Sequence, residues 1–234
     1  ILLKNDVLDL LAMLRNTDLV LWFNSLGAAA SLNGFHGQAA YRRDLPTSVR
    51  VAPPKHPLAK QKRFPVEDAE VLQMANVGSV KIGTLKEWPA QAMVFTGDEE
   101  DVLAEAAYRY INLLQEKNLP HNVLFVKGRV FVFVKNRDRL VTRLGINPAA
   151  PELAGIVTVS DPKWMGNPPS ADTIREALAE ATISRTGLFA LLKEFRNRYF
   201  ADEGTSIRGR LTEAFASKKE SQIRRYLSQM ISEA

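Results

Sequence analysis

The sequence of 234 residues predicts an α+β fold, in which an antiparallel sheet is packed by helices and a helical C-terminal extension follows. Short apolar runs between turn-forming residues are typical of strands, and two of them flank Lys127-Gly128, a pair that favours a tight β-hairpin. Other segments carry apolar residues at helical spacing. Only helical spacing continues through the last part of the chain. We therefore expect an α+β domain at residues 1–185 and a helical extension at residues 186–234.

The N-terminal part is expected to contain a helix and two strands. Apolar residues recur at helical spacing in residues 6–15, and Asn5 or Asp6 is suited to cap that helix. Residues 19–23 and 34–41 flank a connection rich in Gly, Ala and Ser, so we expect two strands joined by this connection.

The second of these strands has one nearly bare face. Successive side chains of a strand point to opposite sides, so four residues share that face: Gly34, His36, Gln38 and Ala40. The opposite face carries Phe35 and Tyr41, which we expect to pack into the core. Apart from one imidazole and one amide, the first face has almost no side-chain bulk, so another molecule can approach it closely.

A basic, proline-rich segment follows at residues 42–65. Proline removes backbone donors and interrupts regular structure, so we expect a loop. Its cations either belong to a solvated connector or form an arm that contacts phosphates. We favour the connector, because charge runs usually face water. His56 lies in this loop and is expected to be exposed rather than catalytic.

The middle of the chain is expected to combine strands with one helix. The strands are predicted at residues 77–85, 88–95, 121–126 and 129–135. The helix is predicted to run from the acidic residues Asp98–Asp101, which suit the positive end of a helix dipole, to about Lys117. Both faces of residues 129–135 are apolar, so this strand should be central. His121 begins a core strand and is expected to be structural.

The C-terminal part is expected to contain one more strand and several helices. Residues 153–159 have the composition of a strand, and Ser170 is suited to cap a helix that runs to about Ile183. Apolar stripes recur on otherwise Arg- and Lys-rich helical segments in residues 186–234. These stripes either dock on the domain itself or form a partner interface.

The composition restricts the chemistry. With 31 Lys and Arg against 26 Asp and Glu, the net charge of +5 and pI near 9.5 suit phosphate-bearing partners, small or polymeric. The absence of Cys excludes disulfides, thiolate catalysis and Cys-based zinc sites. The 3 His are far apart in sequence, so we expect no metal site. We also expect no cofactor. No run is long enough to span a membrane, and we expect no membrane partner. The chain starts at Ile, almost at once in a helix-like segment, so we expect it to be part of a longer protein.

His36 and Gln38 suggest phosphoryl chemistry. A neutral imidazole can attack phosphorus and form a phosphoramidate, which splits one transfer into two steps. Such a reaction needs room for a phosphate beside the ring and donors for its oxygens. Gly27 and the neighbouring Ala residues allow a phosphate to approach the backbone, and Gln38 offers a neutral donor on the face of His36.

The same stretch carries a family resemblance. Asn24-Ser25-Leu26-Gly27, then Ala30-Ser31-Leu32-Asn33 and His36-Gly37-Gln38 resemble the signature of the histidine triad (HIT-like) superfamily. The similarity is to its transferase branch, which includes galactose-1-phosphate uridylyltransferases, and is closer to GDP-L-galactose and GDP-D-glucose phosphorylases. Further matching segments follow in the same order, at Trp88-Pro89, Asn118-Leu119-Pro120, residues 121–125 and residues 152–155. The resemblance covers about residues 5–185.

The resemblance implies a fold and a set of roles. The fold is a HIT-like antiparallel sheet in two halves, packed by helices. His36 would attack the α-phosphorus of a nucleoside-diphosphate sugar, and inorganic phosphate would then release GDP. Gln38 would orient the phosphoryl group as the second catalytic residue. Five residues would bind the phosphates and nucleotide: Asn24, Gly27, Ser31, Asn33 and Gly34.

Two functions are compatible with these residues. The first is a GDP-hexose phosphorylase or nucleotidyltransferase that acts through a nucleotidyl-histidine. The second follows from Gly34, which occupies the position of the family's first triad histidine. It is a catalytically inactive homologue that binds the 5′-phosphorylated end of an RNA, such as a guide RNA, in a mitochondrial ribonucleoprotein complex. Either protein is expected to be a homo- or heterodimer, located in the cytoplasm or, as the alternative, in mitochondria.

Overall fold

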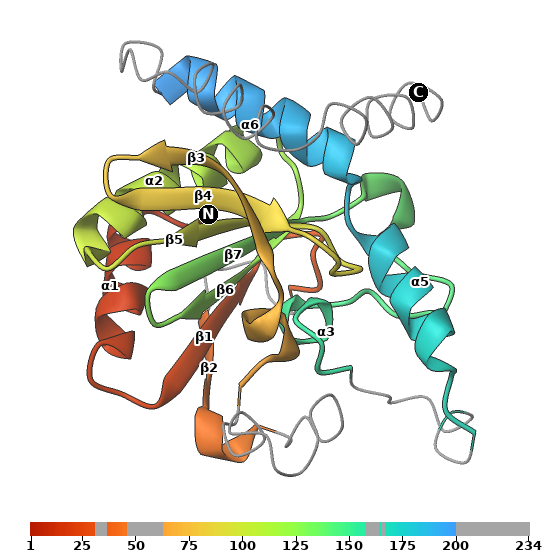
Figure 1. Ribbon diagram of the computed structural model, residues 1–234. Coiled ribbons are helices and arrows are strands. Elements are labelled where there is room, and N and C mark those ends of the chain that lie inside the picture. The colour runs from red at the N-terminus through yellow and green to blue at the C-terminus, as the bar shows by residue number, and fades with distance from the viewer. Residues whose placement is uncertain (31–36, 46–62, 158–163, 165–166, 200–234) are drawn as a thin grey trace, which may run out of the picture. The chain divides into compact units, whose positions relative to one another are not determined.

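Seven strands form one sheet in the order β2-β1-β6-β7-β5-β4-β3 in the computed structural model of the chain (Figure 1). The structure describes residues 1–30, 37–45, 63–157, 164 and 167–199. The strands are β1 (Leu19–Asn24), β2 (Gly37–Tyr41), β3 (Val71–Val77), β4 (Val80–Leu85), β5 (Ala92–Thr96), β6 (His121–Val126) and β7 (Arg129–Val134). All neighbouring pairs are antiparallel, which confirms the predicted sheet. The described strands form one continuous sheet, where two halves were expected.

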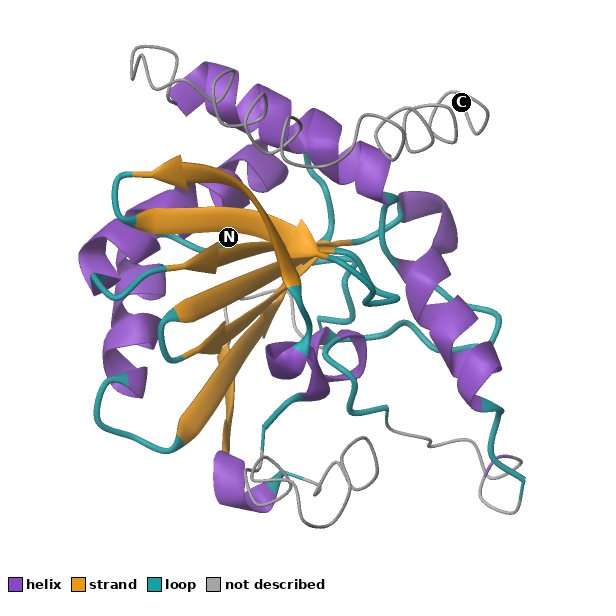
Figure 2. Cartoon of the chain, viewed as in Figure 1, coloured by secondary structure: helices purple, strands orange, loops and turns teal. Residues whose placement is uncertain are grey.

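The helices lie on both faces of this sheet and confirm the α+β class (Figure 2). They are α1 (Lys4–Leu14), α2 (Glu100–Glu116), α3 (Ala150–Leu153), α5 (Ala171–Ala181) and α6 (Arg185–Tyr199). The described residues also form three short 3-10 helices, η1 (Arg42–Asp44), η3 (Pro65–Asp68) and η4 (Arg137–Arg139). α1 and α2 cover one face, whereas η3, α3 and α5 contribute to the core on the other. None of the described helices is long and apolar enough to cross a membrane.

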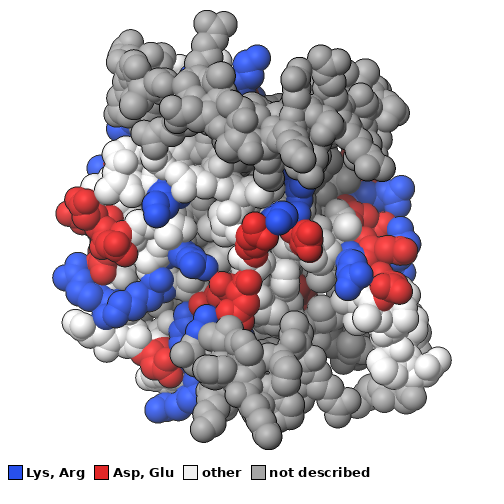
Figure 3. Space-filling view, in the orientation of Figure 1, with Lys and Arg blue, Asp and Glu red and all other residues white. Residues whose placement is uncertain are grey.

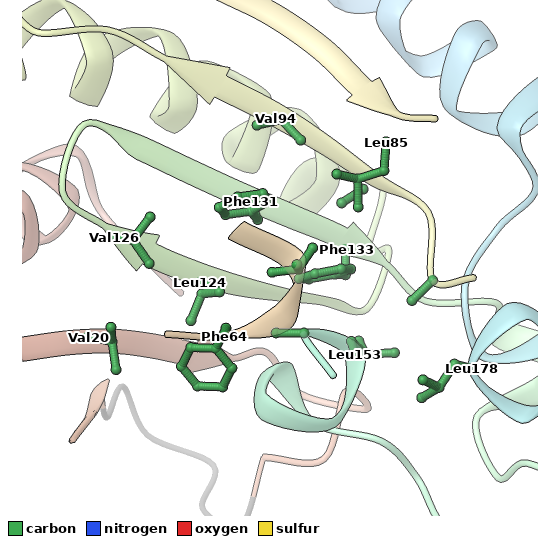
Figure 4. Close-up of a cluster of buried hydrophobic side chains, with 14 of the residues drawn as sticks. Val20, Phe64, Leu85, Val94, Leu124, Val126, Phe131, Phe133, Leu153 and Leu178 are labelled. Atoms are coloured by element: carbon green, nitrogen blue, oxygen red, sulfur yellow. The ribbon is translucent and has the colours of Figure 1, made fainter. Parts of the chain in front are cut away.

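The alternation of strand side chains builds a core on each face. In β7, Phe131 and Phe133 point to one side and Val130, Val132 and Val134 to the other, and all five are buried. This confirms β7 as a central strand. On the side of Phe131, the core includes Leu124, Phe64, Leu153 and Leu178 (Figure 4). On the other side, Phe95, Tyr110 and Phe195 pack edge to face or tilted, with ring centroids 5.4–6.3 Å apart.

The pairing of β1 with β2 confirms the predicted N-terminal strand pair. The register places Trp22 opposite Gln38 and Leu19 opposite Tyr41. The prediction that Tyr41 packs into the core is wrong, since its side chain is 46% exposed and lies under the guanidinium of Arg43 at 4.3 Å. The reason is that β2 is an edge strand, and α1 reaches it at the other end, where Leu10 lies beside Gly37. Phe35 lies outside the described residues.

The strands predicted at residues 77–85 and 88–95 correspond to β4 and β5, which begin later, at Val80 and Ala92. Two other differences are larger. β3 was not predicted, because a bulge between Gln73 and Ala75 interrupts its alternation and leaves no clean strand pattern. The strand predicted at residues 153–159 is wrong, since the chain there begins with the last turn of α3. Pro151 suits the first turn of a helix, and the Glu152 carboxylate accepts from the N–H of Ala149 at 3.0 Å. These local signals outweigh the apolar composition. Residues 158–163 lie outside the described part.

The C-terminal helices agree with the prediction as far as they are described. Ser170 caps α5, and its hydroxyl accepts from the N–H of Thr173 at 3.1 Å. α6 belongs to the same compact unit as the sheet, which spans residues 1–199, and buries Phe195. Most of the predicted extension lies outside the described residues. The division at residue 185 therefore stays a prediction.

Candidate functional site

β1 ends at Asn24 in a turn that needs left-handed backbone. Gly27 has φ +80°, and a Cβ there would lie 3.3 Å from Cγ of Pro120, so glycine suits this position for two reasons. Ala29 has φ +64°, which is costly for a residue with a Cβ and must be held by its surroundings. Two side-chain amides supply such contacts: Asn147 donates to the Gly27 carbonyl at 3.3 Å and Asn122 to the Ala28 carbonyl at 2.7 Å.

Asn24 is buried, and both polar atoms of its side chain form hydrogen bonds. Its Oδ1 accepts from Nδ2 of Asn122 at 2.7 Å and from the N–H of Ala150 at 3.1 Å. Its Nδ2 donates to Oε1 of Gln38 at 3.2 Å. Only 6% of the residue is exposed. Asn24 therefore connects three separate parts of the chain at one end of the sheet.

Gln38 stands at the exposed end of these contacts. Its Oε1 accepts from Nδ2 of Asn24 and from Nε1 of Trp22, the latter at 2.5 Å. Trp22 is held in turn against Phe64, with ring centroids 6.3 Å apart. Within the described residues, no acceptor lies at hydrogen-bond distance from Nε2 of Gln38. Gln38 therefore presents two N–H donors without a formal charge.

The orientation of these amides follows from groups that have only one possible role. We call Asn24, Gln38 and Asn122 the amide network. An indole N–H only donates, a backbone N–H only donates, and a backbone carbonyl only accepts. Trp22, Ala150 and Ala28 supply these three groups at the ends of the network. These partners therefore determine which atom of each amide is the oxygen and which is the nitrogen.

His121 lies next to Asn122 but points to the other face of β6. It is 1% exposed, and its Nδ1 lies 2.8 Å from the Leu119 carbonyl. Since a carbonyl only accepts, Nδ1 carries the proton, and Nε2 is a buried acceptor with no partner in the part of the chain that the structure describes. Burial lowers the pKa of His121 to about 4. Its surroundings match the expected structural role.

Lys135 is a buried cation that the sequence pattern did not single out. It follows β7 on the side of Phe131 and Phe133, and its Nζ donates to the Pro148 carbonyl at 2.8 Å. Burial lowers the pKa of Lys135 to about 8, against the opposing effect of the Glu152 charge. This bond fixes the segment just before Ala150, which contacts Asn24. Its position directly after an apolar hairpin strand is the sequence feature that could have indicated a buried lysine.

The basic loop is used structurally at both of its described ends. Arg42 binds the Glu67 carboxylate through two nitrogens, at 2.9 and 3.0 Å, and Arg63 binds Asp68 at 2.9 Å. On the face drawn in Figure 3, described Lys and Arg side chains are interspersed with Asp and Glu. Residues 46–62, including His56, lie outside the described part. These pairs agree with a connector for the ends of the segment.

Three of the predicted site residues are described: Asn24, Gly27 and Gln38. A hydrogen bond joins Asn24 to Gln38, and Gly27 lies in the turn that follows Asn24. Ser31, Asn33, Gly34 and His36 lie outside the described residues, so their roles stay predictions. The sequence did not reveal Trp22, Asn122 or Ala150, which complete the network from other segments. In the part of the chain that the structure describes, no group of three His, Asp or Glu residues is placed to hold a metal ion.

Comparisons with known proteins place the chain in a family. No curated protein sequence matches it. Among solved structures it is similar to "Crystal structure of yeast Ap4A phosphorylase Apa2 in complex with AMP", with 18% identity and a TM-score of 0.46. The alignment covers 80% of this chain and 65% of that chain, less than two thirds of its length.

The family profile "GDPGP1-like, C-terminal domain" matches residues 65–195, more than half of the chain. The matched region includes Asn122 and Ala150 and begins after the segment from Asn24 to Gln38. It confirms the resemblance to the GDP-hexose phosphorylase branch of the histidine triad superfamily. The chain belongs to the family of GDPGP1-like C-terminal domains.

Proposed function

We propose that the protein is a GDP-hexose phosphorylase that transfers a nucleotidyl group through His36. Family membership supports the class of reaction. The orientation of Gln38 is the observation that carries the proposal at the level of residues. Its Oε1 is occupied by Trp22 and Asn24, so its N–H donors remain for a ligand beside His36, which is two residues away in sequence.

The proposed reaction has two displacements at one phosphorus. In the first, a lone pair of the neutral His36 imidazole attacks the α-phosphorus, and an N–P bond forms. The bond from that phosphorus to the bridging oxygen breaks, and the sugar phosphate leaves with the electron pair. In the second, an oxygen of inorganic phosphate attacks the same phosphorus. The N–P bond breaks, its electron pair returns to the imidazole, and GDP is released.

Gln38 would stabilise the negative charge that develops on the α-phosphate oxygens during each displacement. Its N–H donors suit the non-bridging oxygens of the α-phosphate. Because the amide is neutral, it does not form an ion pair that would slow release of the product. Removing one well-placed donor of this kind typically costs about 10²–10³ in kcat. Gly27 allows the phosphates to approach the backbone, and we assign Ser31, Asn33 and Gly34 to the same phosphate-binding segment. Asn24 would act indirectly, because its own polar atoms are already bonded.

The direct test is product formation together with detection of the adduct. The protein is incubated with GDP-glucose or GDP-L-galactose, with and without phosphate. Release of GDP is followed by chromatography, and a nucleotidyl adduct is sought by mass spectrometry of the intact protein without phosphate. His36→Ala should abolish both signals, while His56→Ala, the matched histidine control, should leave both unchanged. Absence of GDP and of the adduct in the unaltered protein would refute the proposal.

A second candidate function rests on Gly34, which stands where the family has its first triad histidine. In that case the site binds the 5′-phosphorylated end of an RNA without catalysis. Binding of a short RNA with a 5′-triphosphate is compared with the same RNA carrying a 5′-hydroxyl. The triphosphate should bind more tightly, and its affinity should fall steeply with salt. Equal affinity for the two ends would rule this candidate out. A dimeric state and a cytoplasmic or mitochondrial location also stay predictions.

A further inference from the structure

We propose that Asn122 is a positioning residue that keeps Gln38 oriented as a donor toward the phosphoryl group. The inference deepens the proposed function and rests on it for the role of Gln38. Asn122 never reaches the ligand in this scheme. It acts through Asn24, whose side chain lies between it and Gln38.

The first argument is how the Asn122 amide is used. The residue is completely buried, and its Nδ2 donates to Oδ1 of Asn24 and to the Ala28 carbonyl, both at 2.7 Å. Both amide hydrogens are therefore used. Its Oδ1 is buried and has no partner among the described residues. Buried polar atoms are nearly always paired, and an unpaired one destabilises the fold. An apolar side chain would avoid that cost but would leave the Ala28 carbonyl without its donor, so the amide serves the turn as well as Asn24.

The second argument is the direction of the hydrogen bonds. Asn122 can only donate toward Ala28, which puts a donor opposite Asn24. Asn24 then turns its oxygen to Asn122 and Ala150 and its nitrogen to Gln38. Gln38 must therefore accept this hydrogen bond through its oxygen, and its nitrogen remains available to donate to the ligand. Reversal of any one amide would place oxygen against oxygen or consume the donors of Gln38.

The third argument is that the neighbouring elements reinforce this direction from two sides. Ala150 donates to Asn24 from α3, and Trp22 donates to Gln38 from within β1. Trp22 and Gln38 are opposite each other in the strand register, so the indole is fixed by backbone pairing. Because the partners at its ends are fixed as donors or acceptors, the network should be disturbed more by a change in the polarity of the residue-122 side chain than by a change in its volume. This gives the inference a specific test.

Two substitutions separate polarity from packing. Asn122→Leu removes the donor without imposing a new direction, and Ala150 can still hold Asn24. Asn122→Asp keeps the shape but presents only acceptors, which favours a reversed Asn24 with its oxygen toward Gln38. Thr84→Val is the matched control, because Thr84 is buried and donates to the Ala92 carbonyl at 3.0 Å on another strand pair.

The kinetic readout is kcat and KM for the GDP-hexose with saturating phosphate, measured on folded variants. We expect kcat to fall about 10- to 100-fold in Asn122→Asp and less in Asn122→Leu, with KM within about threefold, because misplacing a group by about 1 Å can cost on the order of 10² in rate. Thr84→Val should lower the unfolding midpoint but leave kcat unchanged. Wild-type kcat in Asn122→Asp, or a loss of kcat in Thr84→Val that matches its loss of stability, would overturn the inference.

A second readout does not depend on activity. Hydrogen exchange of the Trp22 indole N–H is measured by NMR, with Trp22→Phe used to assign its signal. Exchange should accelerate in Asn122→Asp and stay as in wild type in Thr84→Val. If the unaltered protein forms no GDP but this exchange accelerates, the phosphorylase proposal fails and the positioning role stands. Unchanged exchange in Asn122→Asp overturns the positioning role whatever the activity.

Discussion

Two regions of the interior, an aromatic cluster and the amide network, are stabilised by different kinds of interaction. Between the sheet, α2 and α6, the rings of Phe95, Tyr110 and Phe195 pack together, and their contribution depends on buried area. Where β1 ends and β6 begins, the amide network is held by bonds that each have a donor and an acceptor. An apolar cluster tolerates many arrangements of similar volume. The amide network is compatible with only one direction of its hydrogen bonds, and this direction leaves the donors of Gln38 for a ligand.

The largest expected effect tests the apolar region. Phe195→Ala should lower the free energy of unfolding by about 3–5 kcal/mol, because it leaves a cavity beside Phe95 and Tyr110. The measurement is urea denaturation followed by circular dichroism. Phe195→Leu is the control and should cost clearly less. A loss below 1 kcal/mol in Phe195→Ala would contradict the packing of α6 on the domain.

The next effect concerns the pH dependence that His121 imposes beside the network. Its pKa is about 4 when folded and near 6.5 when unfolded, so the unfolded chain binds more protons in that window. The free energy of unfolding should therefore decrease as pH falls from 6.5 to 4, by up to about 3 kcal/mol. Denaturation curves at several pH values measure it. In His121→Leu this decrease should be much smaller, and an identical slope in both proteins would speak against a neutral buried imidazole.

Lys135 should produce a dependence of the same sign at alkaline pH. Its pKa is about 8 when folded and near 10.5 when unfolded, so the unfolded chain again binds more protons between these values. The free energy of unfolding should rise with pH through this window, by on the order of 2 kcal/mol. Lys135→Met should remove the rise, whereas the exposed Lys4→Met should not. Persistence of the rise in Lys135→Met would assign it to another group.

The smallest effect is an exception within the apolar region. The hydroxyl of Tyr110 is buried and has no hydrogen-bond partner within residues that the structure describes, and burial raises the pKa of Tyr110. Tyr110→Phe should therefore be neutral or stabilising by up to about 1 kcal/mol, since an unpaired polar group is removed. Thermal and urea unfolding provide the measurement. A clear loss of stability would mean that this hydroxyl has a partner, and that the two regions are less different than we infer.

Local patterns predicted those elements whose signals lie within a few residues. The hairpin around Gly128 has φ +71° at that glycine, and Ser170 caps α5 as its position indicated. β3 escaped prediction because its bulge breaks the alternation, and residues 153–159 misled because an apolar run does not distinguish a strand from a helix end. In β3 the bulge removes the strand pattern itself, whereas the apolar run at residues 153–159 is overridden by the helix signals of Pro151 and Glu152.

The sequence by itself determined the candidate motif, from Asn24 to Gln38, and the family to which it points. It could not determine how Gln38 is oriented, because an amide has two nearly identical ends. That choice depends on Asn122, 98 residues from Asn24 along the chain, and on Ala150, 126 residues away. Only the tertiary structure brings these donors to Asn24. Their hydrogen bonds decide which end of Gln38 is left for a ligand.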